Sequence, residues 1–132
     1  MNSEMAGPHW PEGYGRIVLD SVDSTLSEAA RIAPDLPGPT WILAYEQTAA
    51  RGRRGRAWAM PKGNFAATLV LPLANDPGQA ALRSFVVSLA LHEAFVAATG
   101  RHASFALKWP NDVLLNGGKV AGILLETVST GT

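Results

Sequence analysis

The sequence predicts an α+β domain in which a mixed, largely antiparallel sheet is packed with helices. Short apolar runs bounded by glycine and proline recur along the chain, which is typical of strands. Two segments have helical character, and the expected order of elements is β-α-β-β-α-β-β-β. This order gives an α+β domain whose helices pack against a mostly antiparallel sheet.

Length and composition fit one globular domain. The chain has 132 residues, of which 47% are hydrophobic and 17% charged, and its formal net charge is zero. The absence of cysteine excludes disulfides, thiolate metal sites and cysteine nucleophiles, and it fits an intracellular protein. The sequence shows neither a secretory signal nor an apolar run of about 18 residues, the length of a membrane span. We therefore expect a cytoplasmic protein, with residues 1–13 irregular and a domain at 14–132.

The first elements are a short strand and a helix. Ile17, Val18 and Leu19 form the apolar centre of a strand at 15–20. Residues 26–33 have helical propensity, and Asp23 or Ser24 before them suits an N-cap. Prolines and a glycine at 34–39 end the helix in a rigid loop.

Two further strands follow. The apolar run at 40–46 predicts a strand buried on both faces. The next strand is expected at 64–73, with Thr68 as its only polar interior residue. Residues 75–78, Asn-Asp-Pro-Gly, predict the turn after it.

The longest predicted helix covers residues 79–99. Apolar side chains recur along it at spacings of three and four residues, which predicts its packing face, and Gly100 marks its end. The members of this face are Leu82, Phe85, Val86, Leu89, Phe95 and Val96. His92 and Glu93 are expected on a solvated face.

The last part of the chain predicts three strands, at 105–109, 112–115 and 119–127. Pro110 breaks the first from the second. Asn116-Gly117-Gly118 predicts a tight hairpin between the second and the third.

A cluster of arginines between two predicted strands indicates an anion site. Four arginines occupy six positions at 51–56, separated by Gly52 and Gly55, and no acid occurs from 49 to 63. Arginine presents a planar fork of donors that matches phosphate and carboxylate oxygens, and glycine lets the backbone approach a ligand. A solvated surface or a nucleic-acid arm is the alternative. The rest of the chain is not basic, which disfavours nucleic acid as a partner.

A second group of polar residues lies at 108–112, Lys-Trp-Pro-Asn-Asp, with Lys119 eleven residues after Lys108. The hairpin between them returns the chain to its starting level, so Lys119 and Asp112 are expected to lie close together. A surface ion pair worth at most about 1 kcal/mol is one interpretation. A lysine in an otherwise apolar strand favours the other, in which its ammonium meets an anion.

Together these motifs resemble those of the biotin–protein ligases. The resemblance rests on the arginine loop with Trp58, on residues 108–112 and on Lys119-Val-Ala-Gly-Ile-Leu, and it extends over about residues 14–127. It implies a class II aminoacyl-tRNA synthetase/biotin ligase-like fold. The implied activity uses biotin and ATP with Mg²⁺ to make biotinyl-adenylate, and then transfers biotin to a lysine of a biotin carrier domain. The resemblance also admits a homodimer.

The resemblance implies roles at the biotin end of the site. Ser24, Thr25 and Gln47 would hydrogen-bond the ureido ring. Arg51 and Gly52, together with the neighbouring Arg53, would clamp the carboxylate and phosphate region and close over the adenylate.

It also implies roles at the nucleotide end. Trp58 would pack under the nucleotide, with Lys108, Asn111 and Arg53 close to it. Lys119 would bind the biotin carboxylate and the α-phosphate, and Asp112 would orient the incoming lysine or the metal. Catalysis would thus rest on Lys119, Arg51 and Asp112, with no metal ligand assigned.

The sequence departs from the family pattern at three places. Ala50 replaces a glycine, Leu26 replaces an asparagine, and the chain stops at Thr132 where the family's catalytic domain continues. Two alternatives therefore stay open beside the ligase: a binding module that has lost turnover, and a lipoate or octanoyl ligase or transferase. Because ordering a loop costs about 1–2 kcal/mol per residue, we expect residues near 50–58 to be mobile without ligand.

Overall fold

The computed structural model describes residues 9–72 and 77–129, which form two compact units. The first unit holds three strands and the first helix, and the second unit holds the long helix and three further strands. Their order along the chain follows the predicted one, with additional short helices.

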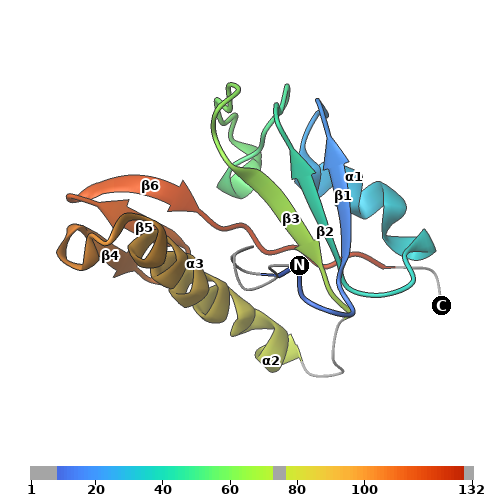
Figure 1. Ribbon diagram of the computed structural model, residues 1–132. Coiled ribbons are helices and arrows are strands. Elements are labelled where there is room, and N and C mark those ends of the chain that lie inside the picture. Colours follow the sequence, from blue (N-terminus) through green and yellow to red (C-terminus); the bar gives the residue numbers. More distant parts are fainter. Residues whose placement is uncertain (1–8, 73–76, 130–132) are drawn as a thin grey trace, which may run out of the picture. The chain divides into compact units, whose positions relative to one another are not determined.

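The sheet of the first unit has the strand order β1-β2-β3 (Figure 1). β1 (Gly15–Leu19) runs parallel to β2 (Thr40–Ala44), and β2 runs antiparallel to β3 (Ala66–Val70). The register places Ile42 between Ile17 and Thr68. Because β1 and β2 are parallel, the segments that follow them leave the sheet at the same edge.

β2 is buried on one face only, which corrects the prediction of two buried faces. Thr40, Ile42 and Ala44 are buried, whereas Trp41 and Leu43 are half-buried. Alternate side chains of a strand point to opposite faces, and α1 (Thr25–Ile32) contacts β2 and β3. Because the side chains at 41–45 are apolar on both faces of the strand, the sequence did not show which face is buried.

Helix α1 begins where the sequence predicts. Ser24 is its N-cap, and the Ser24 hydroxyl accepts a hydrogen bond from the Ser27 amide at 2.9 Å. The helix ends at a short 3₁₀ helix, η2 (Ala33–Asp35), which contains Pro34. The cap satisfies one of the amide groups that a helix start leaves unpaired.

The second unit contains two helices in place of the single one predicted. They are α2 (Pro77–Ala81) and α3 (Arg83–Thr99), and Gly100 ends α3 in a left-handed conformation with φ of 71°. The predicted turn at 75–78 lies in part outside the described residues, as does Leu73 at the end of the predicted strand 64–73. Residue 77 begins α2.

The sheet of the second unit has the order β4-β5-β6 and is antiparallel throughout. After the 3₁₀ helix η4 (His102–Ser104) come β4 (Phe105–Lys108), β5 (Asp112–Leu115) and β6 (Gly118–Gly122). The β5–β6 hairpin turns at Asn116 and Gly117, whose φ angles of 50° and 84° are those of the predicted two-residue turn.

β6 is shorter than the strand predicted at 119–127. It ends at Gly122, one residue before Ile123, whose amide donates to the Asn111 carbonyl at 2.8 Å. β5 begins at Asp112, which pairs with Gly122, so the β5–β6 ladder ends at this point. An apolar run extends a strand only as far as a neighbour accepts its hydrogen bonds.

The buried face of α3 is polar, which contradicts the predicted packing face. Ser84 and Ser88 are buried, while four residues of the predicted face are exposed by 40–66%: Leu82, Phe85, Val86 and Leu89. Phe95 does pack, stacking on Phe105 with a centroid distance of 5.0 Å. When apolar residues occur on all sides of a helix, their spacing does not identify which side packs against the sheet.

Hydrogen bonds to backbone carbonyls select this face. The Ser88 hydroxyl donates to the Pro110 carbonyl at 2.8 Å, and His92 Nε2 lies 3.3 Å from the Phe105 carbonyl. His92 is half-buried and so does not lie on the solvated face predicted for it, whereas Glu93 is exposed.

By length and composition, one segment within residues 9–72 and 77–129 could cross a membrane. Gly78–Thr99 spans 22 residues and contains an 18-residue window with a mean hydropathy of 1.4, which corrects the absence of such a run expected from the sequence. The core helices of soluble proteins pass the same test. This helix hydrogen-bonds the sheet beside it through Ser88 and His92.

Candidate active site

The segments that follow β1 and β2 run side by side and place the predicted biotin residues at one edge. Val22 and Gln47 form a parallel bridge. The Val22 amide donates to the Glu46 carbonyl at 3.1 Å, and the Thr48 amide donates to the Val22 carbonyl at 2.9 Å. This pairing continues the β1–β2 register beyond the strands and brings Thr25 beside Gln47.

Thr25 and Gln47 are joined by two hydrogen bonds. The Thr25 amide donates to Gln47 Oε1 at 2.7 Å, and the Thr25 hydroxyl lies 3.2 Å from the same oxygen. The Thr25 hydroxyl is also 2.8 Å from the Thr68 hydroxyl of β3. Thr25 is 4% exposed, so this is a buried polar network on the side of the sheet that faces α1.

The Ser24 side chain caps the start of α1. Its hydroxyl caps the helix and is 3.2 Å from the Ser27 hydroxyl, and its side chain is buried. The capping role predicted for Ser24 is confirmed. Its role toward a ureido ring stays a prediction.

An ion pair that sequence reasoning missed holds the loop before α1. Both terminal nitrogens of Arg31 donate to the Asp23 carboxylate, at 2.6 and 3.0 Å, and Arg31 Nε donates to Glu28 at 2.8 Å. These hydrogen bonds from Arg31, with one from the Ser24 amide, lower the pKa of Asp23 from 3.8 to about 2. The sequence signal for this ion pair was Arg31 in the last turn of the helix, eight residues after Asp23.

The arginine loop is paired at its base. Arg51 and Ala57 form an antiparallel bridge, and the Trp58 amide donates to the Ala50 carbonyl at 3.0 Å. Within it lies a 3₁₀ turn, η3 (Arg53–Gly55), where Arg54 has a φ of 59°. The side chains of Arg51, Arg54 and Arg56 are exposed, and the side chain of Arg53 lies outside the described part.

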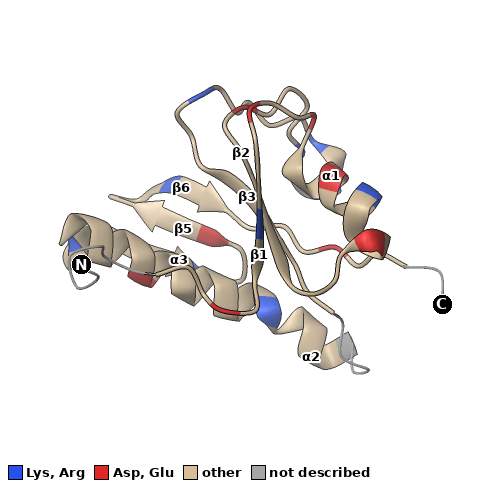
Figure 2. Ribbon diagram, turned by 45° about the vertical axis from the view of Figure 1, so that its right-hand side comes forward, with Lys and Arg blue, Asp and Glu red and all other residues tan. Residues whose placement is uncertain are grey.

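Lys119 and Asp112 lie together, as the hairpin predicts. Lys119 Nζ is 3.2 Å from Asp112 Oδ1, and the two side chains are 38% and 21% exposed. Figure 2 shows a basic residue on β6 and an acidic residue on the neighbouring strand β5. The register pairs Asp112 with Lys108 on one side and with Gly122 on the other. Asp112 is thus the acid of a strand that has lysines on both neighbours.

Gly122 leaves room for the Lys119 side chain, because it has no β-carbon. A β-carbon at residue 122 would lie 3.0 Å from Lys119 Cε and 3.1 Å from Nζ. An irregularity between Val113 and Leu114 shifts the β5–β6 register here. The lysine therefore lies across the backbone of Gly122 on its way to Asp112, a contact that sequence reasoning did not find.

The bend at 108–112 is held on two sides. Asn111 Nδ2 donates to the Ile123 carbonyl at 3.0 Å, and Ser88 of α3 donates to the Pro110 carbonyl. Lys108 is exposed. The Asn111 side chain thus joins the bend to the residue that follows β6, and its contact with a nucleotide stays a prediction.

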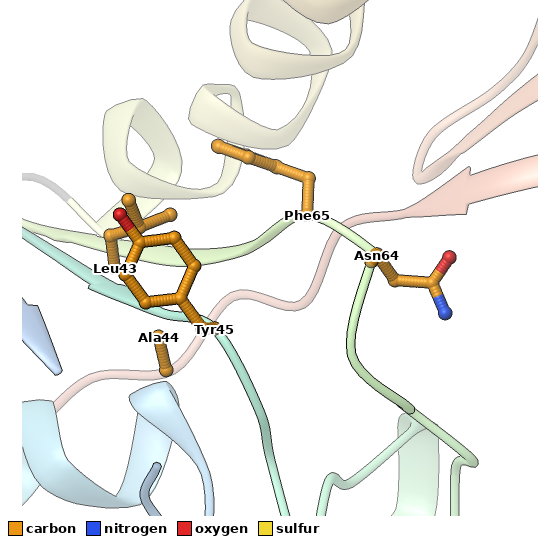
Figure 3. A pocket seen from close by; sticks show the side chains of 6 residues that line it. Leu43, Ala44, Tyr45, Asn64 and Phe65 are labelled. Carbon is orange, nitrogen blue, oxygen red and sulfur yellow. The ribbon is translucent and has the colours of Figure 1, made fainter. Parts of the chain in front are cut away.

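None of the predicted site residues lines either of two open hollows among residues 20–65 of the first unit. The smaller has a volume of about 290 Å³ and is lined by Leu43, Ala44, Tyr45, Gly63, Asn64 and Phe65 (Figure 3). The larger, of about 470 Å³, is lined by Asp20, Tyr45, Lys62 and Gly63. Thr25 instead hydrogen-bonds Gln47 and Thr68.

The predicted residues thus form two groups, one in each unit. Thr25 with Gln47 is the first, and Asp112 with Lys119 is the second. The arginine loop and Lys119 are expected to act on one ligand, and this convergence stays a prediction. So does the mobility of the loop without ligand.

The chain belongs to the biotin/lipoate A/B protein ligase family, whose model matches residues 17–132. It is 58% identical over 114 residues to the biotin–[acetyl-CoA-carboxylase] ligase of Paracoccus denitrificans, covering 86% of this chain and 48% of that protein. It is 37% identical over 116 residues to the bifunctional ligase/repressor BirA of Escherichia coli, covering 86% and 35%. The chain thus spans about half the length of the Paracoccus denitrificans relative and about a third of the Escherichia coli relative.

Solved structures show the same fold. The biotin protein ligase of Leishmania major in complex with biotinyl-5-AMP superposes with a TM-score of 0.78 at 29% identity, covering 89% of this chain and 53% of that one. The Aquifex aeolicus enzyme in complex with biotin and ATP gives a TM-score of 0.71 at 31% identity, covering 88% and 48%. The predicted α+β, biotin ligase-like fold class is confirmed.

Proposed function

We propose that the protein is a biotin–protein ligase that activates biotin with ATP and transfers it to a lysine of a biotin carrier domain. The observation that carries the proposal is the 58% identity to a biotin–[acetyl-CoA-carboxylase] ligase. By the name of this relative, the acceptor proposed is the carrier domain of acetyl-CoA carboxylase. The complexes of two structural neighbours with biotinyl-5-AMP and with biotin and ATP support the same substrates.

The first step joins two anions. A carboxylate oxygen of biotin attacks the α-phosphorus of ATP, the bond to the β-phosphate oxygen breaks, and pyrophosphate leaves. Cations offset the repulsion and stabilise the charge that develops. We assign this role to Lys119 and Arg51, with Gly52 and Arg53 completing the clamp. Asp112, 3.2 Å from the Lys119 ammonium, holds it in place.

The second step forms the amide. The amine of the acceptor lysine attacks the acyl carbon of the adenylate, AMP leaves, and the nitrogen loses a proton. Asp112 is the carboxylate proposed to orient that amine. Trp58, Lys108 and Asn111 are proposed to contact the nucleotide. Because an acyl-adenylate is labile in water, closure of the arginine loop over it protects the intermediate.

Mg²⁺ is proposed as part of the substrate, Mg-ATP. Within residues 9–72 and 77–129, no group of three or more histidine or acidic residues is placed to hold a metal ion. Asp112 contributes one carboxylate, of which one oxygen meets Lys119. The phosphates of ATP supply the remaining oxygen ligands that this ion prefers.

The biotin end of the site is proposed at the edge that follows β1 and β2. Thr25, Gln47 and Ser24 lie there with hydroxyl and amide groups of the kind that bind a cyclic urea. We also propose that the enzyme is soluble and cytoplasmic, and that it forms a homodimer, which sedimentation would test.

Pyrophosphate release from biotin and Mg-ATP, measured with the full protein, tests the proposal. We expect turnover by the wild type and a loss of about 100-fold or more in Lys119→Ala, the scale of removing one group that stabilises developing charge. Arg101→Ala, at an exposed residue outside the site, is the matched control. Lipoate in place of biotin should release no pyrophosphate.

The outcomes separate the claims. A full protein that turns over neither substrate refutes the ligase proposal. Turnover of lipoate alone would assign the chain to the lipoate branch of the family. Lys119→Ala activity equal to that of Arg101→Ala would refute the assignment of Lys119.

A further inference from the structure

We infer that Thr68 is a positioning residue of the biotin site, which holds the Thr25 hydroxyl in place against Gln47 and so helps to select a cyclic urea as the bound ring. The inference rests on the proposed function. Thr68 has no role in the proposed chemistry and was noticed in the sequence only as the polar residue of an apolar strand.

The position of Thr68 is set by the sheet. It is the third residue of β3, opposite Ile42 of β2, whose side chain is fully buried. Paired residues of neighbouring strands share a face, and this is the face that α1 covers. The Thr68 hydroxyl therefore meets the first residue of α1, with 2.8 Å between the two threonine oxygens.

The backbone fixes the orientation of Gln47. The Thr25 amide can only donate, so the atom 2.7 Å from it must be the amide oxygen of Gln47. Gln47 Nε2 is then turned away from Thr25 with two N–H donors. The orientation of the glutamine amide thus follows from hydrogen bonding and is not a free choice between its two ends.

The proton of the Thr25 hydroxyl can be placed by the same reasoning. The Thr25 and Gln47 oxygens are 3.2 Å apart, and two oxygens at that distance repel unless a proton lies between them. Gln47 has no proton on that oxygen, so Thr25 donates. The bond between the two threonines then needs the Thr68 proton, and Thr68 donates to Thr25.

This direction determines what the edge can offer a ligand. Thr25 Oγ1 retains one acceptor lone pair, and Gln47 retains two N–H donors. A cyclic urea carries an acceptor carbonyl and donor N–H groups, and it can satisfy both. A dithiolane ring such as that of lipoate has neither. Thr68 thus helps to set the polarity of the site within a family named for both biotin and lipoate.

Removal of the Thr68 hydroxyl tests the inference. Thr68→Val keeps the branched shape and loses the donor. We expect the KM for biotin in pyrophosphate release to rise about 3- to 10-fold, the scale of one net hydrogen bond, with kcat changed less than twofold. Thr68→Ser, which keeps the hydroxyl, should recover most of the wild-type KM. Melting temperature monitors the fold, and Thr68→Ala replaces Thr68→Val should the latter not fold.

A double-mutant cycle with Gln47→Ala separates positioning from packing. If Thr68 acts through Thr25 on Gln47, then Thr68→Val raises the KM less than twofold in the Gln47→Ala background. An equal rise in both backgrounds would show a structural role only and overturn the inference. So would a Thr68→Val enzyme with the wild-type KM.

The biotin dissociation constant distinguishes this inference from the proposed function. A wild type that binds biotin without releasing pyrophosphate refutes the ligase proposal alone, and the same cycle measured on the dissociation constant still decides the role of Thr68. A wild type that does not bind biotin overturns both.

Discussion

At the scale of single residues, the absence of a β-carbon at Gly122 gives the Lys119 side chain room beside its acid. The Lys119 side chain lies across Gly122, and a methyl group at that position would overlap Cε at 3.0 Å. Nearby Gly118 differs, because a β-carbon there would meet only the Leu115 carbonyl at an ordinary 3.7 Å. The pair offers a matched comparison between a glycine that gives room and one that does not.

We expect Gly122→Ala to lower adenylate formation by about 3- to 10-fold, since Lys119 Cε and Nζ would have to move by a few tenths of an ångström and a displacement of about 1 Å can cost up to 100-fold. Gly118→Ala should stay within about threefold of the wild type. Pyrophosphate release measures both. Equal activities of the two variants would show that the room above Gly122 is not needed.

The pKa of Asp23 gives a second prediction for a single side chain. Hydrogen bonds from Arg31 lower it to about 2 in the folded protein, below its ordinary value of 3.8. The pair therefore stabilises the fold above pH 4, and this contribution is lost as the pH falls from about 4 to about 2. Carboxyl NMR titration should find this pKa near 2, and Arg31→Met should return it toward 3.8. Titration of wild-type Asp23 near 3.8 would contradict the pairing.

The sequence predicted local contacts of side chains and missed distant ones. The Ser24 cap and the approach of Lys119 to Asp112 follow from spacing along the chain, and both are confirmed. Thr68 meets Thr25 across 43 positions, through a register that no local pattern reveals. Spacing along the chain carries no record of which strands become neighbours.

At the scale of elements, α3 shows how few polar contacts orient a helix. Its residues are apolar on every side, so hydrophobic burial alone does not favour one face. His92 contacts the Phe105 carbonyl of β4, Ser88 contacts the Pro110 carbonyl in the bend after β4, and Ser88 is fully buried. The existence of a long helix could be read from the sequence, and its orientation could not.

We expect Ser88→Ala to lower the free energy of unfolding by about 1 kcal/mol, the net value of one hydrogen bond. It should also speed amide exchange at Asn111 and Asp112, because the Pro110 carbonyl loses its anchor. Ser84→Ala is the control, since Ser84 is also buried but donates to the Ala81 carbonyl at the end of α2, not to the bend. Equal exchange at the bend in both variants would contradict an anchoring role for Ser88.

Strand ends were predicted less well than strand centres. The apolar runs at 64–73 and 119–127 both continue past their strands, which end at Val70 and Gly122. Apolar composition favours burial, and a strand also needs a partner that accepts its hydrogen bonds. Where the neighbouring strand stops, the ladder stops, whatever the sequence beyond it.

At the scale of the whole molecule, both units leave large apolar side chains exposed. Phe65 in the first unit is 70% exposed and Val86 in the second is 66% exposed. Apolar surface of this kind marks a site of interaction when it is continuous. The fold class and family could be read from the motifs, but exposure depends on packing, which the sequence does not state.

We expect the 132-residue chain produced alone to bind the dye ANS, and Val86→Lys or Phe65→Lys to reduce the bound fluorescence. The free energy of unfolding should change by no more than about 0.5 kcal/mol, as for other surface substitutions. Urea denaturation measures it. A loss of several kcal/mol would show that the substituted side chain is buried in the folded protein.

The parallel pairing of β1 with β2 has a practical consequence (Figure 1). Each strand delivers a segment that holds proposed biotin-binding residues to a common edge, while α1 and residues 33–39 carry the chain back to the start of β2. A break introduced near Pro37 would leave each segment attached to the strand that aims it. Under the proposed function, we expect a chain divided there to give two halves that bind biotin only when fused partners bring them together, as a reporter of proximity between other proteins.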